Sequence, residues 1–448
     1  MTASDTITQH VHTVVRAANA AATRLAMVPT AAKNDALERI ATELERQAED
    51  ILAANVADVA DTRIAVERGQ CAQTLLDRLR IDSVGLGAMI AGLRTVAALE
   101  DPVGRILERT RLDDRLELER VTVPLGVVAA IFEARPDAVT QISALALKAG
   151  NAVVLKGGSE AARTTRALVA CMRRALAATN DVSEHAISAI EHRASVDALL
   201  ALEDGIDLIV PRGSNALVRM VQRSARVPVL GHGSGVCHVY VDRHADPNMA
   251  VEIILDSKVQ YPAACNAAET VLVHADVASQ LLLPLLSRLA HAGVEVRGCE
   301  RTRTIASVTA PRTLLVPAAE DDWGREYGAL ILACKVVDDI EAAVAHVNMY
   351  GSGHTETIVT DDQGAATYFL GQVDAASVFH NVSTRFADGY RFGLGAEVGI
   401  STGKLHARGP VGLAGLTTYK YLLRGHGHVV ASYAGPNARA FLHERLSP

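Results

Sequence analysis

Cys265 is the residue of this chain best placed for covalent chemistry. It lies in the segment Gln260–Glu269, where small residues flank the thiol, Pro262 precedes it and the apolar run Thr270–His274 follows. Such a turn presents the sulfur to an incoming carbonyl carbon, with backbone amides able to face the carbonyl oxygen. The pattern predicts a nucleophilic thiol. The alternative is a packed cysteine, because free cysteines are commonly buried.

The remaining cysteines and the histidines show no metal-binding spacing. None of the 16 histidines belongs to an HExxH or paired Cys/His arrangement, and His426 with His428 lie in a glycine-containing stretch typical of a solvated loop. We therefore expect no metal, and packing roles for the other cysteines, which lie in apolar or helical-looking stretches. These are Cys71, Cys171, Cys237, Cys299 and Cys334.

Lys156 stands at a junction suited to an anionic ligand. It follows the apolar run Ala152–Leu155 and precedes Gly157, Gly158 and Ser159, after which a helix is expected. Ligands bind beyond the carboxyl ends of parallel strands, and a helix N-terminus attracts anions. An ammonium group here fits a nucleotide phosphate or ribose.

Further glycines mark a second junction and two possible hinges. Gly213 and Ser214 follow a strand-like run, where the alternative is an ordinary turn with Ser214 capping the next helix. The patterns Gly231–Gly235 and Gly393–Gly399 lack the dinucleotide-binding context of strand, loop and helix. For these two we favour hinge or close-packing roles over phosphate binding.

Size and charge favour a protein that acts on small molecules. A chain of 448 residues, 49% hydrophobic and 21% charged, is long enough for two or three domains. A formal charge of −7 without long basic runs gives no footprint for nucleic acid or an anionic membrane. There is no signal-peptide pattern and no apolar run approaching the ~20 residues of a bilayer span. We expect a cytoplasmic protein with reduced thiols.

Periodicity predicts an α/β fold after a helical start. Apolar residues recur at helical spacing within Ala36–Ile51 and Leu86–Leu99, whereas Arg115–Val121 alternates with period two, like one strand of a hairpin. We expect the segment near Arg115–Val123 to pair with the apolar stretch Thr417–Leu423 in an interface sheet, and the protein to be a dimer or tetramer. From residue 126, buried strands alternate with helices, which indicates a doubly wound, largely parallel sheet in two domains. The predicted strands are Gly126–Phe132, Ala152–Leu155, Asp207–Val210, Val227–Leu230 and Cys237–Val241; the helices are Asp137–Lys148, Glu160–Ala178, Asn215–Gln222, Met249–Val259 and Val277–Ala292.

The order of these features resembles the aldehyde dehydrogenase superfamily. A lysine follows a strand, Gly-Ser opens a later helix, and a cysteine lies some fifty residues further on. Within the superfamily the chain is similar to the γ-glutamyl phosphate reductase family, also called glutamate-5-semialdehyde dehydrogenases. The matching segments are Val123–Val128, Ile131–Asp137, Ala149–Ala161, Tyr261–Thr270 and Gly393–Pro410.

The resemblance implies an architecture and a reaction. It implies a Rossmann-type NADP-binding domain (1–104 and 125–235), an α/β catalytic domain (236–415), and a small oligomerisation arm with a C-terminal tail (105–124 and 416–448), hence a homo-oligomer. The implied reaction is reduction of L-glutamyl 5-phosphate by NADPH to L-glutamate 5-semialdehyde and phosphate, a step of proline biosynthesis. A coupling to glutamate 5-kinase stays open.

Two alternatives remain. Another non-hydrolysing member of the superfamily would act on a different acyl phosphate or on an acyl-CoA. A nucleotide-binding scaffold without catalysis would carry Cys265 as a packed thiol.

The resemblance also assigns roles to residues. Cys265 matches the nucleophile and Lys156 the nucleotide-binding lysine, while Gly213 and Ser214 match the cofactor-contacting turn. Glu326 falls near the glutamate that holds the nicotinamide ribose; a solvent-exposed glutamate is the alternative. Ser159 replaces a glutamate of NAD-using relatives, which removes a repelling charge and favours NADPH.

Two departures concern the reaction centre. Leu230 stands where hydrolysing relatives carry a glutamate base, and a thioester that is to be reduced needs no such base. Ala134 stands near the place of the superfamily's oxyanion asparagine, so the backbone amides of Cys265 and Asn266 are the candidate oxyanion donors.

An anionic acyl phosphate with an amino acid head group needs cations and hydrogen-bond donors. Arg135 is a candidate for the phosphate, and Asn381, Ser383 and Arg385 are candidates for substrate binding. The alternatives are a surface ion pair for Arg135 and a capped turn for the segment 381–384.

Overall fold

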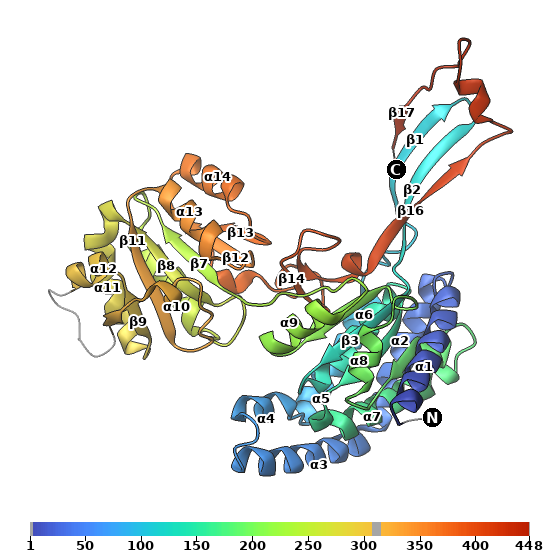
Figure 1. The fold of residues 1–448 in the computed structure, drawn as a ribbon, viewed down its shortest axis with the longest axis horizontal. Coiled ribbons are helices and arrows are strands. Elements are labelled where there is room, and N and C mark those ends of the chain that lie inside the picture. The colour runs from blue at the N-terminus through green and yellow to red at the C-terminus, as the bar shows by residue number, and fades with distance from the viewer. Residues whose placement is uncertain (1–2, 307–314, 448) are drawn as a thin grey trace. The chain divides into compact units, whose positions relative to one another are not determined.

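The computed structural model describes residues 3–306 and 315–447, which form two compact units (Figure 1). Unit 1 comprises Met1–Leu230, Leu394–Gly399 and Val411–Pro448; unit 2 comprises Gly231–Gly393 and Ile400–Pro410. This division by contacts falls between residues 230 and 231, whereas the sequence-based division falls after residue 235 and assigns all of 236–415 to one domain. The functional roles of the predicted domains stay predictions, and residues 307–314 of the predicted catalytic domain lie outside the described residues.

A parallel sheet with strand order β5-β4-β3-β6 forms the centre of unit 1. Its inner strands β3 (Val127–Phe132) and β4 (Ala152–Gly157) confirm the βαβ unit expected from their apolar runs, since strands buried on both faces are continuously hydrophobic. β6 is Leu208–Arg212, and the edge strand β5 (Ile187–Ala189) was not predicted.

The predicted strand Val227–Leu230 is wrong. Val229 forms only an isolated bridge to Ile209, through hydrogen bonds from Ile209 N to Pro228 O and from Leu230 N to Ile209 O. Pro228 has no amide hydrogen to extend the ladder, so an apolar run of strand-forming residues yields a single bridge.

Helices surround this sheet and confirm the helical character of the first hundred residues. The first five are α1 (Ala3–Leu25), α2 (Thr30–Arg46), α3 (Ala48–Glu67), α4 (Gln73–Leu79) and α5 (Ser83–Ala98). The others in unit 1 are α6 (Pro136–Lys148), α7 (Ala162–Ala177, preceded by the 3₁₀ turn η1 at Ser159–Ala161), α8 (Ser195–Leu200), which was not predicted, and α9 (Asn215–Ser224).

A separate four-stranded antiparallel sheet in unit 1 has the order β16-β2-β1-β17. β1 (Ile106–Asp113) and β2 (Leu116–Pro124) form the expected hairpin. β16 (Thr417–Arg424) pairs with β2 from Thr417 opposite Pro124 to Arg424 opposite Glu117, which confirms the predicted pairing of these segments. β17 is Glu444–Leu446.

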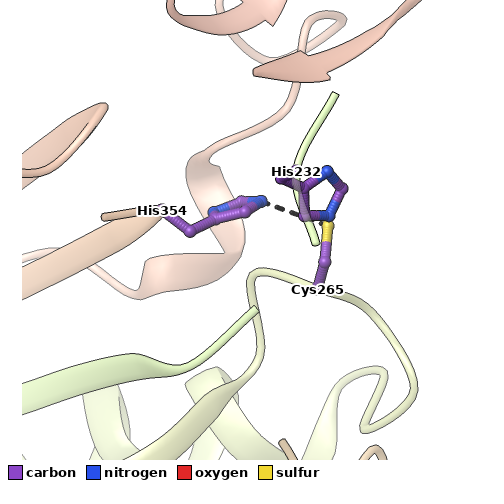
Figure 2. A group of neighbouring side chains, drawn as sticks. All are labelled: His232, Cys265 and His354. Carbon is purple, nitrogen blue, oxygen red and sulfur yellow. Dashed lines mark hydrogen bonds between the residues drawn. The ribbon is translucent and has the colours of Figure 1, made fainter. Parts of the chain in front are cut away.

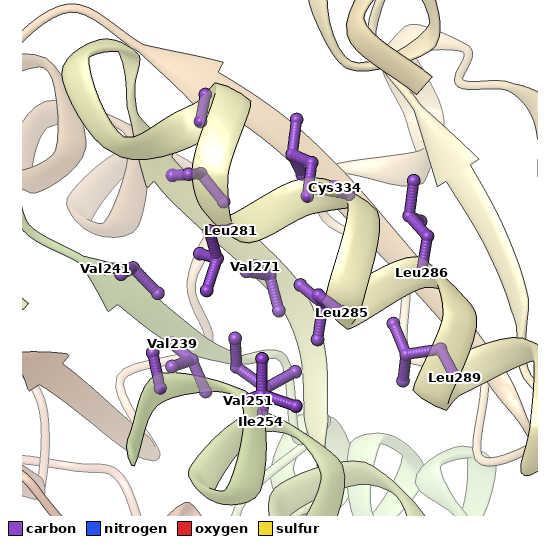
Figure 3. Packing of buried hydrophobic residues seen from close by; sticks show 14 of the residues in the cluster. Val239, Val241, Val251, Ile254, Val271, Leu281, Leu285, Leu286, Leu289 and Cys334 are labelled. Atoms are coloured by element: carbon purple, nitrogen blue, oxygen red, sulfur yellow. The ribbon is translucent and has the colours of Figure 1, made fainter. Parts of the chain in front are cut away.

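Unit 2 is built on a seven-stranded parallel sheet with the order β10-β9-β11-β8-β7-β12-β13. Leucines at helical spacing in α11 pack with α10 against β7 and β8 (Figure 3). The strands are β7 (Cys237–Val241), β8 (Ala268–His274), β9 (Glu295–Gly298), β10 (Leu315–Pro317), β11 (Ile331–Val337), β12 (Thr355–Val359) and β13 (Ser377–His380); the helices are α10 (Pro247–Val259), α11 (Ala275–His291), α12 (Glu300–Ala306), α13 (Ile340–Tyr350) and α14 (Gln363–Gln372). Two short strands, β14 (Gly399–Ser401) and β15 (Gly409–Val411), pair with each other.

Within residues 3–306 and 315–447, no single helix has the length and apolar composition needed to cross a bilayer. The pair α4 and α5, bent by 61°, passes that test only when the two helices are joined, and by length and composition alone.

Candidate active site

Cys265 lies in the turn that joins α10 to β8 of unit 2. Asp246 caps α10 through Met249 N, and Pro247 occupies its first turn, which fixes where this helix begins. After the helix ends at Val259, two successive turns close through Ala264 N to Tyr261 O and Ala267 N to Ala264 O. The thiol itself is half-buried.

Two neighbouring residues hold the Cys265 turn in place. A Cβ built on Gly235 would lie 2.0 Å from Cys265 O, so only glycine allows this approach of backbone to backbone. The buried Cys237 thiol lies 3.3 Å from the same oxygen and donates to it. Gly235 thus has the close-packing role expected for this glycine pattern.

His354 contacts the sulfur directly. Its Nε2 lies 3.2 Å from Cys265 Sγ, and its Nδ1 lies 2.8 Å from Thr355 Oγ1 (Figure 2). Burial, with a smaller contribution from His232, lowers the pKa of His354 to about 3, so the ring is neutral at physiological pH. A neutral imidazole can accept the S–H proton or donate N–H to a thiolate, according to its tautomer.

His232 completes a group of three side chains. Its ring lies edge-on to that of His354, with 5.1 Å between the ring centres, and Figure 2 shows it beside the Cys265 sulfur. Its Nδ1 lies 3.3 Å from Ile400 O. The ligand atoms of His232, Cys265 and His354 all lie within 4.8 Å of one another.

Arg385 brings a positive charge into the surroundings of Cys265. Its Nε donates to Gln260 Oε1 at 2.8 Å, and its side chain is largely buried. Burial first, and then the charge of Arg391, lower the pKa of Arg385, whereas a thiolate at Cys265 opposes this change. The guanidinium is therefore close enough to Cys265 to stabilise negative charge there.

Two other predicted substrate residues have structural partners. Asn381, in the left-handed region with φ 55°, accepts from Thr360 N and donates to Thr360 O, both at 2.9 Å. Ser383 accepts from Arg385 N at 3.3 Å and caps the 3₁₀ turn η4 (Thr384–Phe386), as in the capped-turn alternative. Their roles toward a substrate stay predictions.

The side chain of Asn266 is buried and used by the fold. Its Nδ2 donates to Ala387 O at 2.9 Å. One N–H of the side-chain amide is used in this way, and the role of the backbone amides of Cys265 and Asn266 toward an oxyanion stays a prediction.

Behind the Cys265 turn lies a buried ion pair. Lys258 Nζ, near the end of α10, lies 2.6 Å from Glu269 Oε2 in β8, and neither residue is exposed. Burial raises the pKa of Glu269 to about 7, opposed by Lys258, and burial lowers the pKa of Lys258. Glu269 Oε1 also accepts from Gly328 N at 3.2 Å, which ties the loop that carries the half-buried Glu326 to this pair.

The predicted nucleotide-binding residues lie in unit 1, except Glu326, which lies in unit 2. Lys156, largely buried, is the last residue but one of β4, and its Nζ donates to Gly157 O. Burial lowers the pKa of Lys156, whereas Glu160 raises it. Ser159 is exposed on η1, and its role beside a 2′-phosphate stays a prediction. Arg135, half-buried, lies at the start of α6.

A carboxylate occupies the start of α9. Ser214 caps this helix through Leu217 N, and its own N–H donates to Glu133 Oε2 at 2.8 Å. A Cβ on Gly213 would lie 2.5 Å from the same oxygen. The helix start binds an anionic group, as its dipole favours, so a cofactor phosphate would have to displace Glu133 from this amide.

Sequence reasoning missed His232, His354 and the pair Lys258–Glu269. Residues 232, 265 and 354 are far apart in the chain and meet only because β7, β8 and β12 are adjacent in one sheet. The one local signal was the glycine-rich segment Gly351–Gly353 directly before His354, which indicates a tight connection at the start of β12.

Comparison with known proteins gives one consistent family. Residues 1–310 match the model of the aldehyde dehydrogenase family. γ-Glutamyl phosphate reductase of Natronomonas pharaonis is 51% identical over 440 residues, covering 98% of this chain and 99% of the relative. The enzyme of the same name from Cyanothece sp. is 54% identical over 426 residues, covering 95% of this chain and 96% of the relative. The crystal structure of γ-glutamyl phosphate reductase from Thermotoga maritima superimposes with a TM-score of 0.89 at 41% identity, covering 94% of this chain and 99% of that one.

Proposed function

The chain belongs to the aldehyde dehydrogenase family and, within it, to the γ-glutamyl phosphate reductases, and from this we infer that it reduces L-glutamyl 5-phosphate to L-glutamate 5-semialdehyde and phosphate. The observation that carries the proposal is the half-buried Cys265 thiol, held in a tight turn 3.2 Å from a neutral imidazole nitrogen. Such a thiol has the access and the partner that a covalent nucleophile needs.

The first chemical step is proposed to be attack of Cys265 Sγ on the acyl carbon of the substrate. A C–S bond forms, the C–O bond to phosphate breaks, and inorganic phosphate leaves, so that a thioester remains on Cys265. Arg385 supports this step because its buried charge stabilises the thiolate and the departing phosphate. His354 holds the sulfur in place before and after its proton is lost, since its ring accepts in one state and donates in the other.

Family membership implies a nicotinamide cofactor, and we propose NADPH. The fit rests on Lys156, an ammonium at the end of a parallel strand, and on the exposed neutral Ser159 beside it, which leaves a 2′-phosphate unopposed by charge. When bound, the cofactor supplies the hydride that reduces the thioester carbonyl carbon. The C–S bond then breaks, which releases the aldehyde and returns the sulfur of Cys265.

The proposal also accounts for the buried Leu230 at the position where hydrolysing relatives carry a base. A side chain that activates water there would divert the thioester to glutamate. A leucine leaves the intermediate available for reduction.

The reverse reaction tests the proposal. Purified protein mixed with glutamate 5-semialdehyde, inorganic phosphate and NADP is expected to produce reduced nicotinamide, measured by absorbance, at a rate that requires phosphate. NAD in place of NADP is expected to give a lower kcat/KM. A signal without phosphate would show hydrolytic aldehyde oxidation instead. A signal that requires free coenzyme A in place of phosphate would show that the acyl donor of the forward reaction is an acyl-CoA.

We propose that the antiparallel sheet of unit 1 mediates homo-oligomer formation. β16 lies at the edge of this sheet and exposes Tyr419, Tyr421 and Leu423, each about half accessible. An exposed edge strand with apolar side chains favours pairing with another chain. Sedimentation at micromolar concentration is expected to show a dimer or larger species. Tyr421→Lys should shift the distribution toward monomer, whereas an unshifted monomer of the unmodified chain would remove the proposal.

A further inference from the structure

The group formed by His232, Cys265 and His354 has the composition of a transition-metal site. One thiolate and two imidazoles are ligands that suit Zn²⁺ and not Mg²⁺ or Ca²⁺, which prefer oxygen. The three ligand atoms lie within 4.8 Å of one another, and the Sγ–Nε2 distance to His354 is 3.2 Å. Zinc–ligand bonds of about 2.0–2.3 Å in a tetrahedron separate neighbouring ligand atoms by about 3.4–3.6 Å. Small side-chain movements would therefore suffice.

The partners of the two histidines orient their rings in the way metal-binding histidines require. Thr355 Oγ1 lies 2.8 Å from Nδ1 of His354, and Ile400 O lies 3.3 Å from Nδ1 of His232. A carbonyl oxygen can accept a hydrogen bond but cannot donate one. The hydrogen of the His232 ring therefore lies on Nδ1, and the lone pair on Nε2. The Thr355 hydroxyl can donate or accept, so it orients the His354 ring without fixing its tautomer. Outer partners of both kinds raise the affinity of a histidine for metal.

We propose that His232, Cys265 and His354 together bind one Zn²⁺ ion, with the fourth position open to water. The thiol loses its proton to solvent as the S–Zn bond forms, and the two histidines contribute neutral nitrogens. Three protein ligands make an open site, in contrast to the four of a closed structural one. No spacing motif marks the group, because its members come from three separate segments of unit 2.

Zinc binding itself requires only these three side chains, whereas the inhibition that follows from it rests on the proposed function. A sulfur bonded to zinc cannot attack an acyl phosphate, so bound zinc inhibits the reductase reversibly. Chelation of the metal restores the free thiol and with it the activity.

The experiment measures metal binding on the full chain without substrate or cofactor. Metal-free protein competes with a chromophoric chelator for Zn²⁺, and Co²⁺ as a second probe reports a thiolate-to-metal absorption band. The unmodified chain is expected to bind one equivalent. Loss of an outer partner lowers metal affinity by about 10–100-fold, and loss of a ligand should cost more. Cys265→Ala and His232→Ala are therefore each expected to lower the zinc affinity by more than this factor. Cys265→Ala should also remove the cobalt–thiolate band.

The matched control is the double variant His426→Ala with His428→Ala, which removes an exposed and a half-buried histidine of unit 1. It should bind zinc like the unmodified chain; loss of binding in this control, with retention in Cys265→Ala, overturns the proposal. Circular dichroism identifies any variant that fails to fold. In that case Thr355→Val, which is expected to weaken zinc binding by about tenfold, is tested in place of the unfolded variant. A chain that binds zinc but shows no reductase activity after the metal is chelated would refute the proposed function alone, and reductase activity in a chain that binds no zinc would refute this inference alone.

Discussion

Replacing Cys265 with alanine is expected to lower turnover by about 10⁴-fold or more, because the covalent step has no other nucleophile in the proposed reaction. The lysine and the glycines proposed to bind the cofactor lie in unit 1, and Cys265 lies in unit 2. Binding of NADPH should therefore persist in the variant. Steady-state rates of the reverse reaction and quenching of NADPH fluorescence measure the two properties separately.

Cys299→Ala is the matched control for this experiment. Cys299 is another half-buried thiol of unit 2, at the end of β9, where its sulfur lies 3.3 Å from Thr302 Oγ1. Its loss should leave turnover within about a factor of two. Iodoacetamide should label Cys265 first in the unmodified chain, and bound substrate should slow this labelling. Turnover retained in Cys265→Ala would show that the nucleophile is a different residue.

Replacing Lys258 with methionine is expected to cost about 3–5 kcal/mol of the free energy of unfolding at neutral pH, because Glu269, left buried without its partner, must either stay charged in the interior or take up a proton. We expect the substitution to weaken cofactor binding as well. Glu269 also accepts a hydrogen bond from the amide of Gly328, so the variant should loosen the loop of Glu326. On the prediction that Glu326 holds the nicotinamide ribose, the KM for NADPH should then rise. Urea denaturation and initial rates measure the two effects.

The cost of Lys258→Met should depend on pH in a defined direction. The pKa of Glu269 is already raised to about 7 by burial, and removing the opposing lysine raises it further. Above the unfolded value near 4.5, the folded state therefore binds a proton that the unfolded state does not, and stability is lost as pH rises through the folded pKa. The variant should be closest to the unmodified chain near pH 5 and furthest from it at pH 8.

Two further variants separate the buried pair from a general effect of charge removal. Lys258→Met combined with Glu269→Leu should recover most of the lost stability, because no unpaired charge remains. Arg288→Met breaks an exposed pair with Glu252, also between neighbouring elements of unit 2, and should cost less than about 1 kcal/mol. An equal loss of unfolding free energy in Arg288→Met and Lys258→Met would contradict the conclusion that burial of the pair causes the larger loss.

The local parts of the fold were predictable because each depends on residues close in sequence. The apolar runs of β3 and β4 and the intervening helix α6 were each predicted within a residue or two, since strong periodicity and flanking glycines mark them. The pairing of β16 with β2 was also predicted, from two segments of strand-forming residues. The short strand β5 was missed because three residues carry too little pattern.

Only the part of the site that is marked by its own local sequence was predictable. Cys265 was found from its own surroundings, whereas the significance of His354 and His232 depends on which strands are neighbours in the sheet of unit 2. Lys258 and Glu269 are similar: a lysine on a helix and a glutamate before a strand are ordinary surface patterns. Only the burial of both shows that they belong to the interior.

The antiparallel sheet of unit 1 joins residues from opposite ends of the chain, since Thr417 of β16 lies opposite Pro124 of β2. A ribosome that has just made β2 must still add the whole of unit 2 before β16 emerges. Throughout that interval the nascent hairpin offers an open row of amides and carbonyls to any neighbouring polypeptide. We therefore expect this chain to depend on a chaperone more during its synthesis than after it has folded.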